Sequence, residues 1–237
     1  MLEQVRKLSY IYAYRLTSDS GSAPCIYDLN GNTTGVLTLV CCKGGQIRSM
    51  GKKNEKEIKT GMRHTIGESH KEEIANGRLN VYVMGIYKNK LLYFANITKI
   101  LLMEDYYAQD SYYKMRYDYI YEFSSGIPKR NNNNRKFHPK GETAQHRRDW
   151  LGKYALISYR FAYWGKESKT ISEDLINILP KYQENKKYKG DSHHGLLIMN
   201  EVSALWDFNS IIQNEPHNYL RNQSHKECGK SENNLIS

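Results

Sequence analysis

The sequence predicts an α+β domain built on a curled, mostly antiparallel sheet or a small barrel, with a few helices packed against it. Several segments alternate apolar and polar residues and are rich in tyrosine and β-branched residues, a pattern typical of half-buried strands. Helical periodicity is confined to a few stretches, and no regular strand-helix-strand rhythm is present. With 237 residues, the chain is long enough to bury a core without disulfides.

Alternation marks four segments as strands, and a longer aromatic run marks a fifth. The four are residues 9–16, 35–42, 80–87 and 91–100. Lys88 to Lys90 separates the last two and is short enough to join them as a hairpin. The aromatic run at residues 154–164 indicates a further strand or a bent pair of strands.

Helical signals are fewer. Residues 103–108 fit one or two turns. Thr170 and Glu173 form a capping box ahead of an apolar stripe, and Pro180 ends that helix. A third helix is expected near the end of the chain, from apolar residues at helical spacing: Ile198, Val202, Leu205 and Ile212.

We expect a single domain over residues 1–214, followed by a polar, aperiodic tail at 215–237. Loop insertions are predicted near 51–61 and 126–141, and a linker at 180–195. No apolar run approaches the roughly 18 residues that cross a bilayer, and no signal peptide opens the sequence. We therefore expect a cytoplasmic protein without a membrane partner.

The charge balance points to a polyanionic partner. Lys and Arg number 35 against 25 Asp and Glu, a formal net charge of +10, so nucleic acid or a nucleotide is the first candidate. Twenty tyrosines suit base stacking, although most are expected to be structural. The four cysteines form no disulfide framework, and the histidines lack zinc-ligand spacing. We predict no metal and no cofactor.

Small residues follow the first strand, in Thr17-Ser-Asp-Ser-Gly-Ser-Ala-Pro24. They allow a ligand to approach the backbone, and Asp19 can orient an exocyclic amine or accept a proton. The alternative is an Asx turn in which Asp19 bonds its own backbone. The second strand ends in Cys41-Cys42-Lys43-Gly44-Gly45, which places a cation beside accessible main chain. This spacing is not that of a P-loop, so no nucleotide triphosphatase is implied.

Two further stretches carry candidate residues. His64 is the best-placed general acid-base group, although a lone histidine is weak support. Within 154–164, alternation places Tyr159, Phe161 and Tyr163 on the face opposite Arg160. Such an arginine can stack on a base or contact phosphate, or it can simply extend outward from a core strand.

The ordered succession of motifs resembles the nucleotide modification associated domain 2 family of bacteria and phages. The resemblance rests on Ser18-Asp19-x-Gly21-x-Ala23-Pro24, Gly35-x-Leu37-Thr38-Leu39 with Cys42-Lys43, Leu92-Tyr93-x-Ala95-x-Ile97-Thr98-Lys99, Tyr106-Tyr107, Asp118-x-Ile120-Tyr121, and Leu156-Ile157-Ser158-x-x-Phe161-x-Tyr163-x-Gly165. Arg63 with Gly67 lies among these motifs, which span roughly residues 9–170.

By fold-level analogy the resemblance implies a PUA-like layout, similar to EVE and ASCH domains, with a pocket for a modified base. It also implies that the 18–24 turn and Cys42-Lys43 meet at one end of the sheet. The expected binding residues are Ser18, Asp19, Cys42, Lys43, Arg63, Asp118, Tyr121, Arg160 and Tyr163.

Three functions are compatible with these features. The first is a nucleic-acid-associated module that binds a modified base or nucleotide within a DNA-modification or phage-defence system. The second is an enzyme acting on a nucleotide or modified base, with Asp19 or His64 as the acid-base group. The third is a subunit that binds other proteins of such a system.

Overall fold

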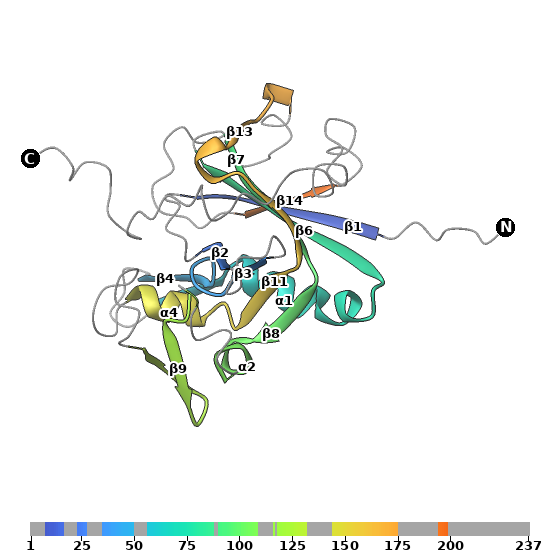
Figure 1. Cartoon of the computed structure of the whole chain (residues 1–237). Coiled ribbons are helices and arrows are strands. Elements are labelled where there is room, and N and C mark those ends of the chain that lie inside the picture. Colours follow the sequence, from blue (N-terminus) through green and yellow to red (C-terminus); the bar gives the residue numbers. More distant parts are fainter. Residues whose placement is uncertain are drawn as a thin grey trace, which may run out of the picture.

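The computed structural model describes nine parts of the chain. They are residues 8–16, 23–27, 35–49, 56–87, 90–108, 116, 118–131, 144–174 and 194–198. The described strands form two main sheets and two small hairpins, with helices packed beside them (Figure 1).

The larger sheet has six strands in the order β12-β7-β6-β1-β14, with β13 also paired to β7. The strands are β1 (Leu8–Arg15), β6 (Leu79–Tyr87), β7 (Lys90–Ile97), β12 (Arg160–Tyr163), β13 (Lys169–Thr170) and β14 (His194–Ile198). β1 and β6 run parallel from the Leu8 and Leu79 pair onward, and the other pairs are antiparallel.

The smaller sheet has four strands in the order β2-β3-β11-β8, all antiparallel. They are β2 (Cys25–Tyr27), β3 (Val36–Leu39), β11 (Tyr154–Ser158) and β8 (Lys99–Leu102). The burial of all four β3 residues and all five β11 residues shows that both strands belong to the core.

The chain passes between the two sheets twice at one corner. β7 continues into β8 through Thr98, and β11 continues into β12 through Tyr159. The amide of Thr98 donates to the carbonyl of Ile157 at 2.9 Å, so the two crossings are bonded to each other. This shared bend curls the strands from one sheet into the other, and none of the described sheets closes into a barrel.

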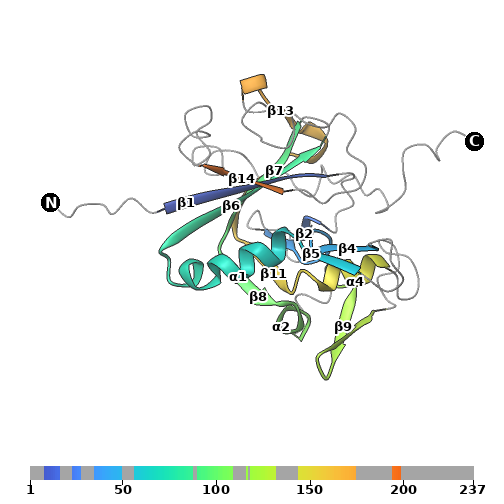
Figure 2. The same cartoon turned by 180° about the vertical axis from the view of Figure 1, so that it is seen from behind.

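Helices and hairpins surround this core. The helices are α1 (Met62–Ala75), α2 (Met103–Ala108), α4 (Ala144–Trp150) and the 3-10 turn η2 (Gly165–Glu167). α1 packs on β6, β8 and β11 and is best seen from behind (Figure 2). One hairpin joins β4 (Gly45–Ser49) to β5 (Lys56–Thr60), and the other joins β9 (Tyr121–Ser124) to β10 (Ile127–Arg130).

The α+β class with a curled, mostly antiparallel sheet is confirmed, and the alternative of a closed barrel does not apply to the described strands. The five predicted strand segments are present, with 91–100 divided at Thr98 and 154–164 divided at Tyr159 as a bent pair. The helix predicted at 103–108 is α2.

Other expectations need correction. Thr170, expected to cap a helix, ends strand β13, and Ile198, expected in a helix, ends strand β14. Glu173 and Asp174, which belong to the helix predicted after Thr170, are helical. The rest of that helix, the residues predicted to continue the second helix after Ile198, and the domain boundary expected at 214 lie outside the described residues. Helices α1 and α4 were not predicted, and strands β5 and β10 lie within the two expected loop insertions.

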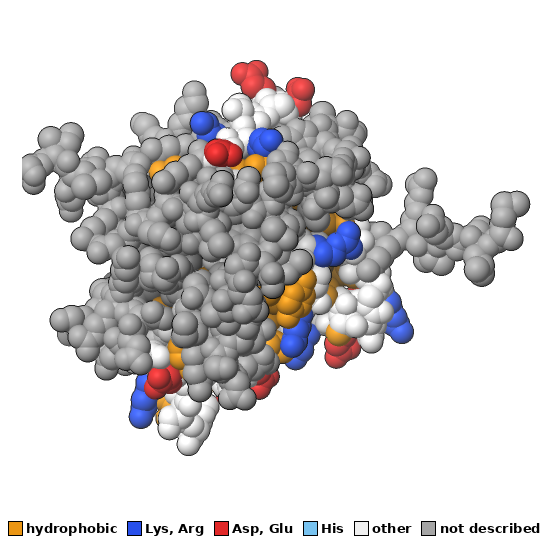
Figure 3. All heavy atoms as spheres, in the orientation of Figure 1, with side chains coloured by type: hydrophobic (Ala, Val, Ile, Leu, Met, Phe, Trp, Pro, Cys, Tyr) orange, Lys and Arg blue, Asp and Glu red, His pale blue; other side chains and the backbone are white. Residues whose placement is uncertain are grey.

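The surface of one face is drawn in Figure 3. Within the described part of the chain, no helix is both long enough and apolar enough to cross a bilayer. Cys25, Cys41 and Cys42 form no disulfide.

Candidate functional site

Lys43 lies against the end of the first strand, where the small-residue segment begins. Its Nζ donates to the carbonyl of Arg15 at 2.8 Å and lies 4.7 Å from the centroid of the Tyr14 ring. Arg15 is the last residue of β1, and Leu16 alone separates it from residue 17. The structure thus places the predicted lysine beside the entrance to the segment that contains Ser18 and Asp19, which themselves lie outside the described residues.

The turn that carries Lys43 has an unusual main chain. Cys42 and Lys43 have φ values of 59° and 50°, in the left-handed region that side chains other than glycine rarely adopt. The amide of Cys42 donates to Asp149 Oδ1 at 2.6 Å, and the carbonyl of Lys43 accepts from the amide of Arg63. These two hydrogen bonds stabilise the left-handed conformation of the turn and so hold the main chain of Lys43 in place.

Gly44 continues this turn against α4. A Cβ at this position would lie 2.2 Å from the carbonyl oxygen of Arg148, so only glycine allows the approach. Its carbonyl accepts from the amide of Gly61 at 2.7 Å. The glycine main chain, expected to be accessible to phosphate, is instead packed against the rest of the fold.

Two arginines meet this turn through their main chain: the Arg15 carbonyl accepts from Lys43, and the Arg148 carbonyl lies against Gly44. Arg15, Arg147 and Arg148 are exposed, and Lys43 is partly exposed. We call Tyr14, Arg15, Lys43 and Arg148 the Lys43 edge. An edge of this composition attracts phosphate and other anions through charge-assisted hydrogen bonds.

Arg63 is held inside the fold. The side chain is fully buried, and its guanidinium donates to the carbonyls of Cys42 at 2.7 Å, Tyr154 at 2.5 Å and Asp149 at 2.5 Å. Gly152 leaves the space for it, because a Cβ there would lie 2.3 Å from the guanidinium carbon. Arg63 was expected to contact phosphate, but burial makes it a connection between α1, α4 and β11.

Tyr121 joins the same cluster through Asp149. Its hydroxyl donates to Asp149 Oδ2 at 2.7 Å, and its ring packs edge-on against His146 and Trp150. Burial raises the pKa of Asp149 despite the neighbouring Arg63, and burial beside Asp149 raises the pKa of Tyr121 well above its usual range. Asp149 therefore stabilises the Lys43 turn by accepting the hydrogen bond from the Cys42 amide.

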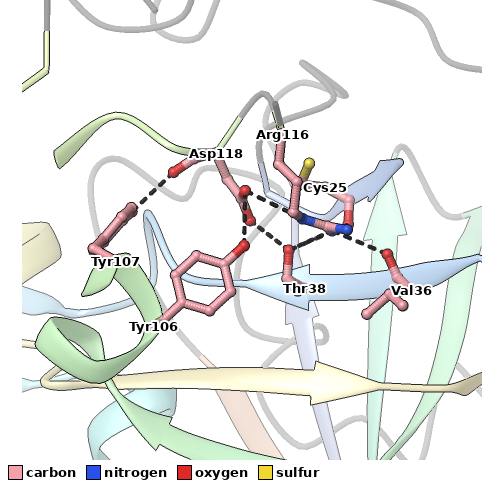
Figure 4. A network of polar contacts seen from close by, with 7 residues as sticks. All are labelled: Cys25, Val36, Thr38, Tyr106, Tyr107, Arg116 and Asp118. Atoms are coloured by element: carbon pink, nitrogen blue, oxygen red, sulfur yellow. Dashed lines mark hydrogen bonds and ion pairs between the residues drawn. The ribbon is translucent and has the colours of Figure 1, made fainter. Parts of the chain in front are cut away.

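Asp118 is the centre of a second buried network, drawn in Figure 4. Its carboxylate accepts from the hydroxyls of Thr38 and Tyr106, and it lies 3.5 Å from Arg116 Nε. All four side chains are fully buried. Asp118 was expected to bond a base edge, yet these internal partners give it a structural role, which ties Asp118 and Arg116 to β3 and α2.

Arg160 and Tyr163 lie in the larger sheet rather than in either cluster. Arg160 is exposed and pairs in register with Asn96, whereas Tyr163 is buried opposite Tyr93. The face alternation expected along this strand is wrong at Tyr159, which is exposed while Phe161 is buried. The cause is the crossing between sheets, which interrupts the alternation after β11.

His64 lies on α1, away from the core. Its Nε2 is 3.9 Å from Glu68 Oε1, and its ring meets the edge of Tyr154. Glu68 in turn accepts from Lys153 Nζ and from the Tyr154 hydroxyl, each at 2.8 Å. Within the described chain, no group of three or more His, Cys, Asp or Glu side chains gathers at metal-binding distances.

Tyr14, Arg15, Arg148 and Asp149 were not among the predicted site residues. Tyr14 and Arg15 close the first strand directly ahead of the small-residue segment, and that adjacency was the one available signal. Arg148 and Asp149 reach the site only through α4, more than 100 residues along the chain from Cys42.

The sequence model of one family, described as nucleotide modification associated domain 2, matches residues 8–223 of this chain. No curated protein and no solved structure matches it.

Proposed function

Because the chain belongs to the nucleotide modification associated domain 2 family, we propose that it binds a nucleotide or nucleic acid carrying a modified base, as part of a DNA-modification or defence system. The family name supports an association with nucleotide modification. The site that we assign to this function is the Lys43 edge, together with the adjoining segment at 17–22.

The observation that carries the proposal is the position of Lys43. Lys43 is partly exposed, and its ammonium is held at the Arg15 carbonyl, in a turn whose main chain meets the exposed residues Arg15 and Arg148. In our proposal these cations bind the phosphate of the ligand, while Ser18 and Asp19 bond the edge of its base. The segment's small residues would allow the base to approach closely.

The net charge supports the same assignment. A formal charge of +10 favours polyanions over neutral ligands and makes their binding depend on salt concentration. We further propose that the protein acts in the cytoplasm, because the described cysteines Cys25, Cys41 and Cys42 form no disulfide and cytoplasmic cysteines remain reduced.

A binding titration tests the proposal. We expect the Lys43→Gln variant to bind a nucleoside 5′-monophosphate roughly 5- to 30-fold more weakly than the unchanged chain, because one charge-assisted contact is lost. Binding of the corresponding nucleoside, which lacks phosphate, is expected to change little. The titrations with monophosphates and those with nucleosides should each compare a modified base with the plain base.

The matched control is Lys129→Gln, which removes an exposed lysine from the β9-β10 hairpin. This variant should bind the monophosphate like the unchanged chain. Equal loss in both variants would show that only net charge matters, and no loss in Lys43→Gln would contradict the proposed site.

A further inference from the structure

An exposed tyrosine stands at the corner where the chain passes between the two sheets. Tyr159 is 52% exposed and connects β11 to β12. Among the described residues, Tyr159 and Ile127 are the only large hydrophobic side chains that are exposed. Most tyrosines in the described part are buried, whereas this ring keeps a flat face and a polar tip available to a ligand.

The main chain beneath the ring is held rigidly. The amide of Tyr159 donates to Thr98 Oγ1 at 3.2 Å, and the amide of Thr98 donates to the carbonyl of Ile157. Ser158 Oγ donates to the carbonyl of Arg160 at 2.8 Å and accepts from its amide at 3.1 Å. A ring on a fixed main chain loses little conformational freedom when a ligand stacks on it.

Two exposed cations lie close to Tyr159, one in the chain and one on the neighbouring strand. Arg160 follows it directly, and Lys99 pairs in register with Ile157 on the neighbouring strand. Both are exposed, and residues 95–102 and 154–163 contain no Asp or Glu. Figure 3 shows hydrophobic side chains next to Lys and Arg side chains over the part of the molecule where β8 and β11 lie in Figure 1.

The other exposed hydrophobic residue has a different setting. Ile127 follows the tip of the β9-β10 hairpin, where a Cβ on Gly126 would lie 3.8 Å from a carboxylate oxygen of Glu104. Glu122, on the partner strand, is also exposed. Glu122 pairs in register with Lys129, so this hairpin carries charges of both signs, whereas residues 95–102 and 154–163 carry cations alone; Ile127 therefore serves as a control.

We infer that Tyr159, Arg160 and Lys99 form a contact for single-stranded nucleic acid, separate from the Lys43 edge. A base stacks on the Tyr159 ring, and Arg160 and Lys99 bind the phosphates on either side of it. The inference deepens the proposed function, since it requires that the ligand be a strand rather than a free nucleotide. A double helix, whose bases are already stacked, cannot use this ring.

Equilibrium binding of a fluorescently labelled single-stranded oligothymidylate tests the contact. Tyr159→Ala should weaken binding roughly 5- to 150-fold, the range found for one stacked base. Tyr159→Phe keeps the ring and should bind like the unchanged chain, as should Ile127→Ala. The double variant Lys99→Gln with Arg160→Gln should lower the salt dependence by about two phosphate contacts.

Parallel titrations with a nucleoside monophosphate separate the two claims. If the strand binds equally well to Tyr159→Ala, or no better than the monophosphate binds, the contact is refuted while the Lys43 edge stands. If the strand depends on Tyr159 but the monophosphate does not bind, the contact stands and the assignment of a nucleotide site to the Lys43 edge fails. Unchanged melting temperatures for all variants would show that a loss of binding does not come from unfolding. Tighter binding of duplex than of single strand would overturn the inference.

Discussion

Two buried carboxylates, Asp118 and Asp149, show how burial decides what a residue can do. Each is almost fully shielded from solvent and accepts hydrogen bonds from a buried tyrosine hydroxyl. A buried charge is tolerated only when its partners replace water, so both side chains are committed to the fold. Their contribution to binding is indirect, through the segments that they hold in place.

The Asp118 network predicts a non-additive pair of substitutions. Asp118→Leu alone leaves the Arg116 charge buried opposite an apolar side chain and should lower the free energy of unfolding by about 3–5 kcal/mol. Adding Arg116→Met removes that charge, so the double variant should lose less than the sum of the single variants. Urea denaturation measures all three. Strict additivity would show that the two side chains do not interact.

Asp149 predicts a pH dependence. Burial raises its pKa in the folded state above the ordinary value of 3.8, so the folded chain holds this proton more tightly than the unfolded chain does. The stability that Asp149 contributes is therefore fully present below about pH 4 and is lost as the pH rises through the folded-state pKa.

Comparison with Asp149→Asn isolates this effect, because the amide keeps an acceptor for Cys42 but does not titrate. Unfolding free energies should be measured for both chains from pH 4 to pH 8. We expect the unchanged chain to gain stability relative to the variant as the pH falls. If the difference in unfolding free energy between the two chains does not change with pH, or changes in the opposite direction, Asp149 ionises in the folded chain without cost.

At this scale the sequence predicted some site residues and not others. Lys43 could be recognised because it closes a strand beside glycines, and the structure places it at the edge of the fold. Arg63 and Asp118 were equally good candidates by residue type, yet both are fully buried. Burial depends on contacts such as Arg63 with Tyr154, 91 residues apart, and no local pattern reveals those.

Helices α1 and α4 escaped prediction for a related reason. The buried face of α1 includes Arg63 and Gly67, and that of α4 includes His146 and Asp149. Polar residues on the buried face break the apolar periodicity by which amphipathic helices are recognised. Moreover, the N-cap residue ahead of α1 is Gly61, which offers no side-chain cap. The helices that carry the buried polar residues are thus the ones that hydrophobic periodicity does not predict.

The close packing of the Lys43 turn on α4 predicts the effect of one added methyl group. In Gly44→Ala the new Cβ would meet the carbonyl oxygens of Arg148 and Asp149 at 2.2 and 2.6 Å. Because main-chain atoms cannot move aside as a side chain does, unfolding free energy should fall by about 1–3 kcal/mol or more.

Gly77 provides the comparison, since its φ is +67° but a Cβ there would meet nothing within 4 Å. Gly77→Asn should cost less than Gly44→Ala in thermal or urea unfolding, because asparagine tolerates this conformation. If the two variants unfold alike, the turn and α4 are not tightly packed.

For the molecule as a whole, the strands were predictable and their arrangement was not. Alternating side chains report that a strand has one buried face, but they do not report its neighbours. β1 pairs in parallel with β6, about 70 residues later, and β3 pairs with β11, more than 100 residues later. The curled shape follows from these long-range pairings and from the bonded crossings at Thr98 and Tyr159.

The same arrangement brings Lys43, in the turn that follows β3, to the end of β1. The proposed function rests on the contact between this turn and the end of β1. Photochemical crosslinking with a nucleotide that carries an azide on its base tests it most directly, because mass spectrometry then identifies the peptide that faces the base. We expect the label on the segment from Tyr14 to Cys25, and much less of it in Lys43→Gln. Label confined to other peptides, such as the β9-β10 hairpin, or label unaffected by Lys43→Gln, would contradict the account.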